Sequence, residues 1–157
     1  MNKISPFLWF DHQAEEASNF YVSVFPNSRI TTMARHGEAG PGPAGSVMTV
    51  AFELEGQSFT ALNGGPVFTF NEAISFVVDC EDQAEVDNLW ERLTADGGQP
   101  SQCAWLKDKY GVSWQIVPRV LMELISDPDA AKAGRVMAAM MQMGKIDIAA
   151  LKAAADG

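Results

Sequence analysis

Gln115 is the residue of this 157-residue chain that most directly raises a chemical question. It lies within the segment SWQIVP, residues 113–118, where strand alternation places Trp114 and Ile116 on one face and Gln115 on the other. A glutamine between an aromatic and a β-branched neighbour in a strand can ligate a metal ion, hydrogen-bond inside a pocket or face water. Because a buried amide without a partner costs about 1–3 kcal/mol, we expect Gln115 to face a cavity. There it would bond to water, to a ligand or to a neighbour such as Ser75.

The other residues with reactive side chains give weaker signals. His12 and His36 are the only histidines and have no His-x-x-His spacing, so we interpret them as exposed or capping residues. A role as general base in a pocket is the alternative, because an unperturbed histidine titrates near neutral pH. Cys80 and Cys103 lie in apolar strand contexts, which favours two buried thiols over a disulfide or a metal pair. No Gly-x-Ser-x-Gly motif supports a nucleophilic serine.

Composition narrows the class of protein. The chain has 20 acidic and 11 basic residues, a net charge of −9 and 47% hydrophobic residues. This length and composition predict one globular domain with a sizeable core. The sequence contains no Lys/Arg cluster, which argues against nucleic acid and anionic membranes as partners. The longest apolar N-terminal run, PFLWF, is too short for a signal peptide or a membrane span, so we expect a cytoplasmic protein.

The elements that must position these residues repeat once along the chain. The first half predicts a strand, a helix and three strands, at residues 4–10, 14–25, 28–36, 46–54 and 58–62. The second half predicts the same order, with a strand at 73–80, a helix opened by Asp82, a short strand from Gln99 and two strands within 103–118. We expect Asp11 or His12 to cap the first helix. Residues 119–157 predict a helical extension, in which one helix begins at Asp127 and continues to about residue 146.

This paired order resembles the vicinal oxygen chelate superfamily, which includes glyoxalase I, extradiol dioxygenases, and fosfomycin and bleomycin resistance proteins. More narrowly, the chain resembles the PhnB-like family, through PFLWFDHQAEEASNFYVSVFPNS, VMTVAFELEGQSFTALNGGPVFTFNEAISFVV, WLKDKYGVSWQIVP and the tail MQMGKIDIAAL. The resemblance implies an α+β fold in which two βαβββ modules form a curved mixed sheet. We place the modules at about 1–70 and 71–118, with residues 119–157 as a helical C-terminal extension of the same domain. The family often carries the label 3-demethylubiquinone-9 3-methyltransferase.

The resemblance also locates the metal positions of the superfamily on this sequence. Metal-dependent members take His, Gln or Glu ligands from the first strand of each module and from the last strand. These positions fall here on Pro6, on Ala73 or Ser75, and on Gln115. Proline and alanine side chains have no donor atom, and one amide oxygen cannot hold a divalent cation. We therefore predict no metal and no other cofactor.

The methyltransferase label has little support in the sequence. Methyltransferases of the common S-adenosylmethionine class place a glycine-rich turn between a strand and a helix of a parallel sheet. Residues 37–45, GEAGPGPAG, have the glycines, but they also contain two prolines and precede a predicted strand. We interpret this segment as a hairpin loop.

A small-molecule-binding function fits these observations best. A curved sheet rich in aromatic residues predicts a largely apolar cavity with a few polar groups. We expect a small-molecule ligand to contact Leu8, Asn63, Ser75, Trp105, Ser113 and Gln115. The leading interpretation is a metal-independent binding protein, and the alternatives are a glyoxalase- or dioxygenase-like metalloenzyme and the labelled methyltransferase. The sequence names neither the ligand nor a catalytic residue.

The C-terminal extension predicts self-association. Superfamily members often build their site across a dimer. The extension contains more apolar residues than one small sheet should need, including Met137, Met140, Met141, Ile146 and Leu151. We therefore expect a homodimer.

Overall fold

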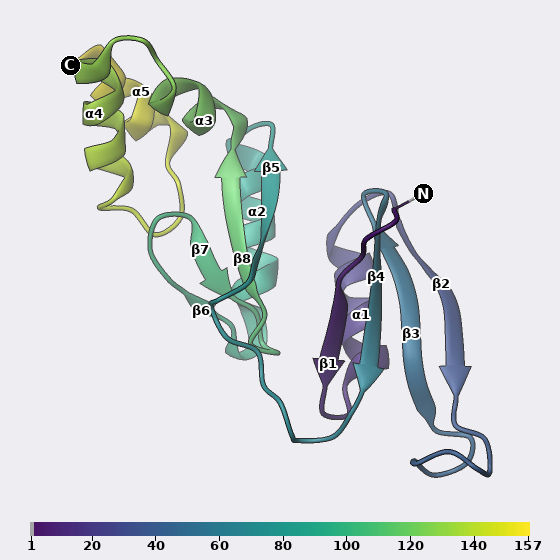
Figure 1. Ribbon diagram of the computed structural model, residues 1–157. Coiled ribbons are helices and arrows are strands. Elements are labelled where there is room, and N and C mark those ends of the chain that lie inside the picture. The colour runs from purple at the N-terminus through teal and green to yellow at the C-terminus, as the bar shows by residue number, and fades with distance from the viewer. Residues whose placement is uncertain (1) are drawn as a thin grey trace. The chain divides into compact units, whose positions relative to one another are not determined.

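The computed structural model describes residues 2–157, which form two compact units that divide after Phe70 (Figure 1). Both units contain the order strand, helix, three strands that the sequence predicts. The expected α+β class with two βαβββ modules and a helical C-terminal region is therefore confirmed. Among residues 2–157, no helix has the length and apolar character that a membrane span requires.

The first unit is a four-stranded mixed sheet with a helix packed on one face. Its elements are β1 (Phe7–Phe10), α1 (Ala14–Val24), β2 (Ser28–Arg35), β3 (Val47–Leu54) and β4 (Gln57–Asn63). The strands lie in the order β1-β4-β3-β2, with β1 parallel to β4 and the other pairs antiparallel. Alternate residues of β1, β3 and β4 are buried on the α1 face, where the Tyr21 ring of α1 stacks on Phe52 and Phe52 stacks on Phe59.

The β3–β4 turn is a two-residue hairpin loop whose shape the sequence encodes. Leu54 pairs with Gln57, and the two residues between them, Glu55 and Gly56, have φ of 49° and 82°. Positive φ at both central residues is the geometry of a type I′ turn, which matches the twist of the flanking strands. Gly56 has no Cβ and adopts a positive φ without strain. The two-residue turn fixes the pairing of Leu54 with Gln57 and so the register of the hairpin.

The second unit repeats this topology and adds the extension. Its sheet elements are β5 (Ser75–Cys80), α2 (Gln83–Thr94), β6 (Gln99–Pro100), β7 (Trp105–Lys107) and β8 (Ser113–Pro118), in the strand order β5-β8-β7-β6, with a 3-10 turn, η1 (Ala95–Gly97), after α2. As predicted, Asp82 caps α2, and its carboxylate accepts a hydrogen bond from the Glu85 N–H at 2.9 Å. This bond satisfies one of the free N–H groups of the first helical turn.

The extension folds as three helices with their own core. They are α3 (Arg119–Ile125), α4 (Ala130–Met140) and α5 (Ile148–Asp156). The core of this region consists of Ala104, Val117, Leu121, Val136, Ile146, Leu151 and Ala155, with Leu124, Ile125, Met140 and Met143 packed against it. Three of the five residues on which we based self-association, Met140, Ile146 and Leu151, therefore lie in or against this intrachain core. Met137 and Met141 remain exposed, at 39% and 57%.

Helix α1 lies where the sequence predicts it, but its predicted cap was wrong, and so were the predicted ends of α4. The N-cap of α1 is Gln13, not Asp11 or His12. The first N–H of the helix, that of Ala14, donates to the side chain of Asn63 at the end of β4. Helix α4 begins at Ala130 rather than Asp127 and ends at Met140. Asp129 is its N-cap and accepts hydrogen bonds from two backbone N–H groups of the first turn.

Candidate ligand-binding site

The face of the second sheet that is turned away from α2, called the site face below, carries Gln115. Its register partners there are Val77 of β5 and Trp105 of β7. Gln115 Nε2 donates a hydrogen bond to Ser75 Oγ at 2.9 Å. Trp114, one residue away, is 3% exposed and lies on the α2 side of the sheet. The predicted alternation of Gln115 and Trp114 is therefore confirmed, and among the partners that the sequence left open for Gln115 the structure shows Ser75.

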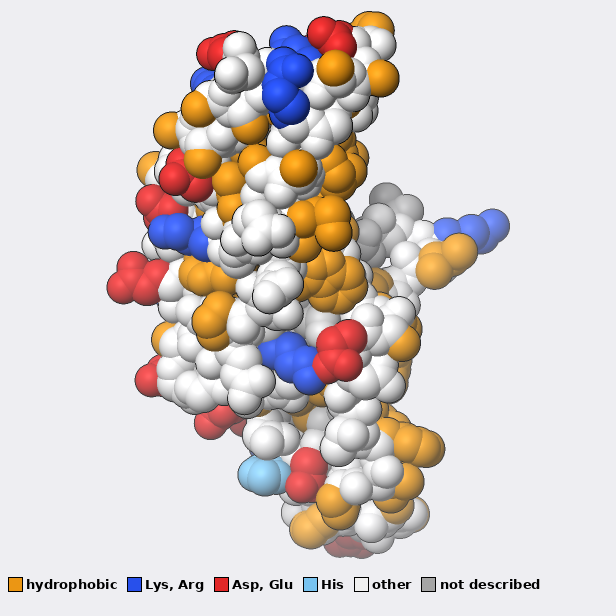
Figure 2. Space-filling view, turned by 90° about the vertical axis from the view of Figure 1, so that its left-hand side faces the viewer, with side chains coloured by type: hydrophobic (Ala, Val, Ile, Leu, Met, Phe, Trp, Pro, Cys, Tyr) orange, Lys and Arg blue, Asp and Glu red, His pale blue; other side chains and the backbone are white. Residues whose placement is uncertain are grey.

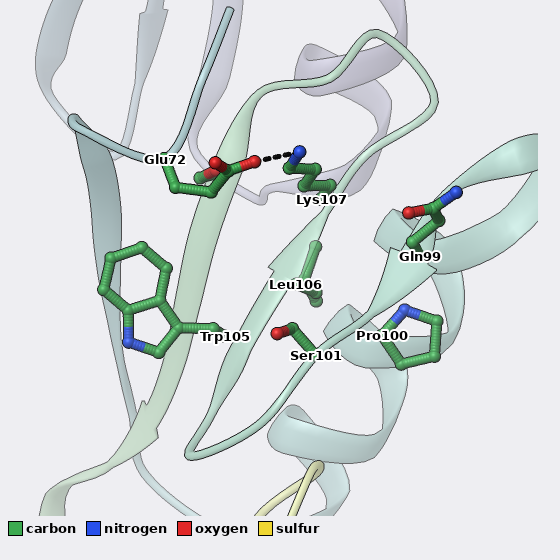
Figure 3. A pocket seen from close by; sticks show the side chains of 8 residues that line it. Glu72, Gln99, Pro100, Ser101, Trp105, Leu106 and Lys107 are labelled. Atoms are coloured by element: carbon green, nitrogen blue, oxygen red, sulfur yellow. Dashed lines mark ion pairs between the residues drawn. The ribbon is translucent and has the colours of Figure 1, made fainter.

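A hollow of about 260 Å³ lies at β6 and β7 of this unit. Its lining residues are Glu72, Gln99, Pro100, Ser101, Trp105, Leu106, Lys107 and Ser113. In the view of Figure 3, the Trp105 and Pro100 rings stand on opposite sides, and the Glu72–Lys107 ion pair lies above Trp105. The two rings give the hollow apolar walls. Five of its eight lining residues are polar or charged, so it is less apolar than the cavity that the sequence predicts: Glu72, Gln99, Ser101, Lys107 and Ser113. The hollow includes Trp105 and Ser113 from the six predicted contact residues.

Glu72 and Lys107 are the charged residues of the hollow. The Lys107 ammonium bonds to the Glu72 carboxylate, and this bond lowers the pKa of the Glu72 carboxyl from its ordinary value of 4.5. Hydrogen bonding to the charged form of an acid favours ionisation. At neutral pH the two residues therefore form an ion pair, and together they add no net charge to the hollow.

The Ser113 hydroxyl is the polar group of the hollow that the fold leaves unsatisfied. Ser113 is 1% exposed, and its Oγ has no hydrogen-bond partner. Its register partners are Ser75 on β5 and Lys107 on β7. A buried hydroxyl without a partner costs free energy, so a ligand that offers a hydrogen bond at this point would recover that cost.

Asp108 is a buried carboxylate that sequence reasoning did not single out. It is 2% exposed in the β7–β8 turn. It accepts hydrogen bonds from the N–H groups of Tyr110 and Val112 and from the Trp114 indole, at 2.9, 3.1 and 2.9 Å. The letters DKYG carried a signal, because Asp first and Gly last in four residues are typical of a turn in which the Asp bonds the backbone. Asp108 thus orders the turn between the strands that carry Trp105 and Gln115.

Two predicted contact residues, Leu8 and Asn63, lie in the first unit and contribute to its fold. Leu8 is 8% exposed and pairs with Ala61 on the α1 face of the sheet, so it is a core residue and is not retained as a ligand contact. The Asn63 Oδ1 accepts from the Ala14 N–H at 2.8 Å, and its Nδ2 donates to Val47 O at 3.1 Å. Asn63 therefore stabilises the start of α1, which sequence reasoning assigned to other residues.

The positions of the superfamily metal do not suit a metal on this chain. Pro6 and Ala73 have no donor atom, the Ser75 hydroxyl accepts from Gln115, and Gln115 offers one amide oxygen. Protein-bound divalent cations take several ligands, mostly imidazole, thiolate or carboxylate. Within the described part of the chain, no group of three or more His, Cys, Asp or Glu side chains could hold a metal ion.

The histidines and cysteines lie outside the hollow. His12 is exposed next to Asp11, with Nδ1 3.6 Å from its carboxylate. His36 follows β2 and lies against Gly40 and Gly42 of the 37–45 loop, which joins β2 to β3 as the predicted hairpin loop. Cys80 and Cys103 are free thiols, and burial raises the pKa of Cys80 to about 12.

The charged surface carries no continuous basic patch on the face shown in Figure 2. Lys and Arg side chains there are scattered among Asp and Glu side chains. Four of the described ion pairs join exposed or half-exposed side chains: Arg29–Glu53, Arg119–Asp79, Lys132–Asp127 and Lys145–Asp87.

Solved structures share this architecture. A PhnB protein from Bacillus cereus, which carries the methyltransferase label, is 39% identical, with a TM-score of 0.68 over 74% of this chain and 99% of that chain. Protein PA1353 from Pseudomonas aeruginosa is 20% identical, with a TM-score of 0.61 over 75% and 98% of the two chains. The fosfomycin resistance protein FosX from Listeria monocytogenes, complexed with Mn(II) and sulfate, is 12% identical, with a TM-score of 0.53 over 74% and 89%. No curated protein sequence matches the chain.

The two mixed sheets have the fold of FosX and of a glyoxalase/bleomycin resistance protein from Albidiferax ferrireducens, and at these identities the likeness is one of fold. Residues 2–117 match the family described as 3-demethylubiquinone-9 3-methyltransferase, and the chain belongs to this PhnB-like family. The match ends within β8, so α3, α4 and α5 lie outside the matched residues.

Proposed function

We propose that this protein binds a small molecule without a metal ion, in the hollow on the site face. The observation that carries the proposal is the buried Ser113 hydroxyl, which has no partner and lies in a hollow walled by Trp105. The Gln115–Ser75 pair lies on the same face, on neighbouring strands. An apolar wall with a few placed polar groups is the usual composition of a ligand pocket.

The hollow suggests the general form of the ligand. Its volume of about 260 Å³ suits a metabolite-sized molecule. The Trp105 ring favours a planar or apolar portion, because aromatic rings stack on flat groups. Ser113 and Lys107 favour polar atoms at the other end of the ligand.

A thermal-shift screen of metabolites and drugs tests this proposal. A ligand at 100 times its Kd should stabilise the protein by about 2.7 kcal/mol. Trp105→Ala and Ser113→Ala should lose the stabilisation, whereas Ser126→Ala, an exposed position outside the hollow, should keep it. Hits that stabilise all three variants equally would place the ligand elsewhere and contradict the proposal.

A glyoxalase- or dioxygenase-like metalloenzyme is the alternative that the superfamily offers. Such an enzyme needs a divalent cation. The side chains of Pro6 and Ala73 have no donor atom, and the Ser75 hydroxyl and the Gln115 amide oxygen are too few ligands to hold one. Elemental analysis of protein purified without chelator decides the matter. About one Zn, Ni, Mn or Fe per chain that survives dialysis would favour the metalloenzyme.

The methyltransferase named in the family description is the second alternative. The loop at residues 37–45 joins antiparallel β2 and β3 and opens no helix, unlike the glycine-rich turn of the common class of these enzymes. We expect no thermal shift with S-adenosylmethionine. A saturable shift with this cofactor would overturn that expectation and support the family label.

We also propose that the protein is a cytoplasmic homodimer. The exposed Met122, Met137 and Met141 of the extension offer apolar surface, and two free cysteines suit a reducing compartment. A stable interface would bury on the order of 1,600 Å². Light scattering at micromolar concentration should give the dimer mass, and a monomer mass would contradict the proposal.

A further inference from the structure

The turn between β6 and β7 has a backbone conformation that residues other than glycine avoid. Cys103 and Ala104 have φ of 57° and 77°. Our expectation that Cys103 lies in a strand is therefore wrong. Consecutive left-handed residues persist only where their surroundings hold them. This turn connects Ser101 to Trp105, and both residues line the hollow.

The segment between α4 and α5, residues 141–147, holds this turn and is called the α4–α5 connection below. The Cys103 N–H donates to Met143 O at 2.8 Å, and the Ala104 N–H donates to Gly144 O at 3.0 Å. Gly144 lies so close to the turn that a Cβ at its position would stand 2.9 Å from the Ser101 carbonyl oxygen. Ala104 itself is 1% exposed within the core of the extension.

Helix α2 also holds the α4–α5 connection, through hydrogen bonds and an ion pair. Gln83 Nε2 donates to Ile146 O at 2.9 Å, and Gln83 Oε1 accepts from the Ile148 N–H at 2.7 Å. Lys145 forms an ion pair with Asp87, one turn further along α2, at 2.9 Å. The connection is thus fixed to α2, and through its own carbonyl groups it fixes the turn beside the hollow.

We propose that the α4–α5 connection is a positioning segment of the ligand site. By accepting the two N–H bonds of the left-handed turn, it sets where Ser101 and Trp105 stand in the hollow. The connection lies beyond residue 117, where the family match ends. The extension would therefore shape a site whose lining residues lie within the matched region 2–117. The effect on ligand affinity rests on the proposed function, whereas the positioning of the turn does not.

Amide hydrogen exchange measured by NMR on the full chain tests the positioning directly. Gln83→Ala removes the side-chain bonds to Ile146 in the connection and to Ile148 at the start of α5, and Gln83 does not line the hollow. Gly144→Ala pushes a methyl group toward Ser101. In each variant the Cys103 and Ala104 amides should exchange about five- to tenfold faster than in the unchanged protein, because their acceptors are displaced. The Trp105 indole signal, assigned with Trp105→Phe, should also shift.

Matched controls separate positioning from general destabilisation. Gln142→Ala changes the same residue type at an exposed site, and Gly134→Ala adds a Cβ where nothing lies within 4 Å. Both controls should leave the two exchange rates and the Trp105 signal unchanged. The proposal is overturned if Gln83→Ala folds yet matches the controls in both readouts. If Gly144→Ala does not fold, Gln83→Ala alone decides.

Ligand affinity supplies an independent readout. Hits from the thermal-shift screen should bind Gln83→Ala more weakly, by about fivefold or more, and Gln142→Ala with unchanged affinity. A screen without hits would count against the proposed function alone, because the exchange rates and the Trp105 signal need no ligand. Unchanged affinity for Gln83→Ala together with faster exchange would overturn the coupling between the connection and the hollow.

Discussion

Gln115 Nε2 donates a hydrogen bond to Ser75 Oγ at 2.9 Å, and this bond joins the two parallel strands β8 and β5 on the site face. Neither residue is fully exposed or fully buried. The superfamily resemblance places Gln115 at one metal-ligand position and Ala73 or Ser75 at another, yet here Gln115 and Ser75 are hydrogen-bonded to each other. The pair thus offers a ligand one amide oxygen and one hydroxyl proton at a fixed place.

Replacing Gln115 by Leu should change stability little and weaken ligand binding. The substitution removes one amide and leaves the half-buried Ser75 hydroxyl within reach of water, so the free energy of unfolding should change by no more than about 1 kcal/mol. Ligand affinity should fall about tenfold if the amide contacts the ligand. Urea denaturation and titration with a screening hit measure the two effects. Unchanged ligand affinity in Gln115→Leu would show that the Gln115 side chain does not contact the ligand.

Replacing Asp108 by Asn should destabilise the protein, because an amide nitrogen cannot accept the hydrogen bonds that a carboxylate oxygen accepts. The Asp108 carboxylate is buried and bonded to Tyr110, Val112 and Trp114. Charge-assisted bonds of this kind contribute about 1.5–3 kcal/mol each, so the loss should be about 2 kcal/mol or more. Asp96→Asn, at an exposed turn position, is the control and should stay within about 0.5 kcal/mol. If urea denaturation gave the same loss of stability for Asp108→Asn and Asp96→Asn, the stabilising role of the Asp108 hydrogen bonds would be contradicted.

Acid should open the Glu72–Lys107 ion pair. The bond to Lys107 lowers the pKa of the Glu72 carboxyl from 4.5. Its stabilising effect is therefore full above pH 4.5 and is lost as the pH falls through the lower pKa of the folded state. In an NMR titration, the Glu72 midpoint should lie below 4.5 and rise toward its ordinary value in Lys107→Met, where the backbone hydrogen bond to the carboxylate remains. Lys109→Met removes the neighbouring lysine and should leave the lowered midpoint in place.

The extension should contribute to stability through its core and not through its exposed methionines. Leu151 is fully buried, so Leu151→Ala should lower the free energy of unfolding by about 2–5 kcal/mol. Met141 is 57% exposed, and Met141→Ala should cost no more than about 0.5 kcal/mol. Truncation after Ser126 should expose Val117 and Leu121 and reduce solubility. A Met141→Ala effect as large as that of Leu151→Ala would point to an interface at Met141.

The sequence by itself determined the features that depend on local pattern. The alternation of β8 placed Trp114 and Gln115 on opposite faces, because side chains in a strand alternate with a period of two. The spacing of turn residues gave the same strand–helix–three-strand order twice, and Asp82 marked the start of α2. The Gln115–Ser75 bond could also be anticipated, since family motifs aligned the two strands.

Only the tertiary structure decided which distant residues meet. Leu8 lies in the core because β1 pairs with β4 in a register that turns this side chain toward α1. Cys103 leaves the strand conformation because Met143, forty residues further along the chain, accepts its N–H. Periodicity reports which face of an element is apolar, but it carries no information on the partner of that face. Contacts between segments far apart in sequence depend on how the whole chain packs.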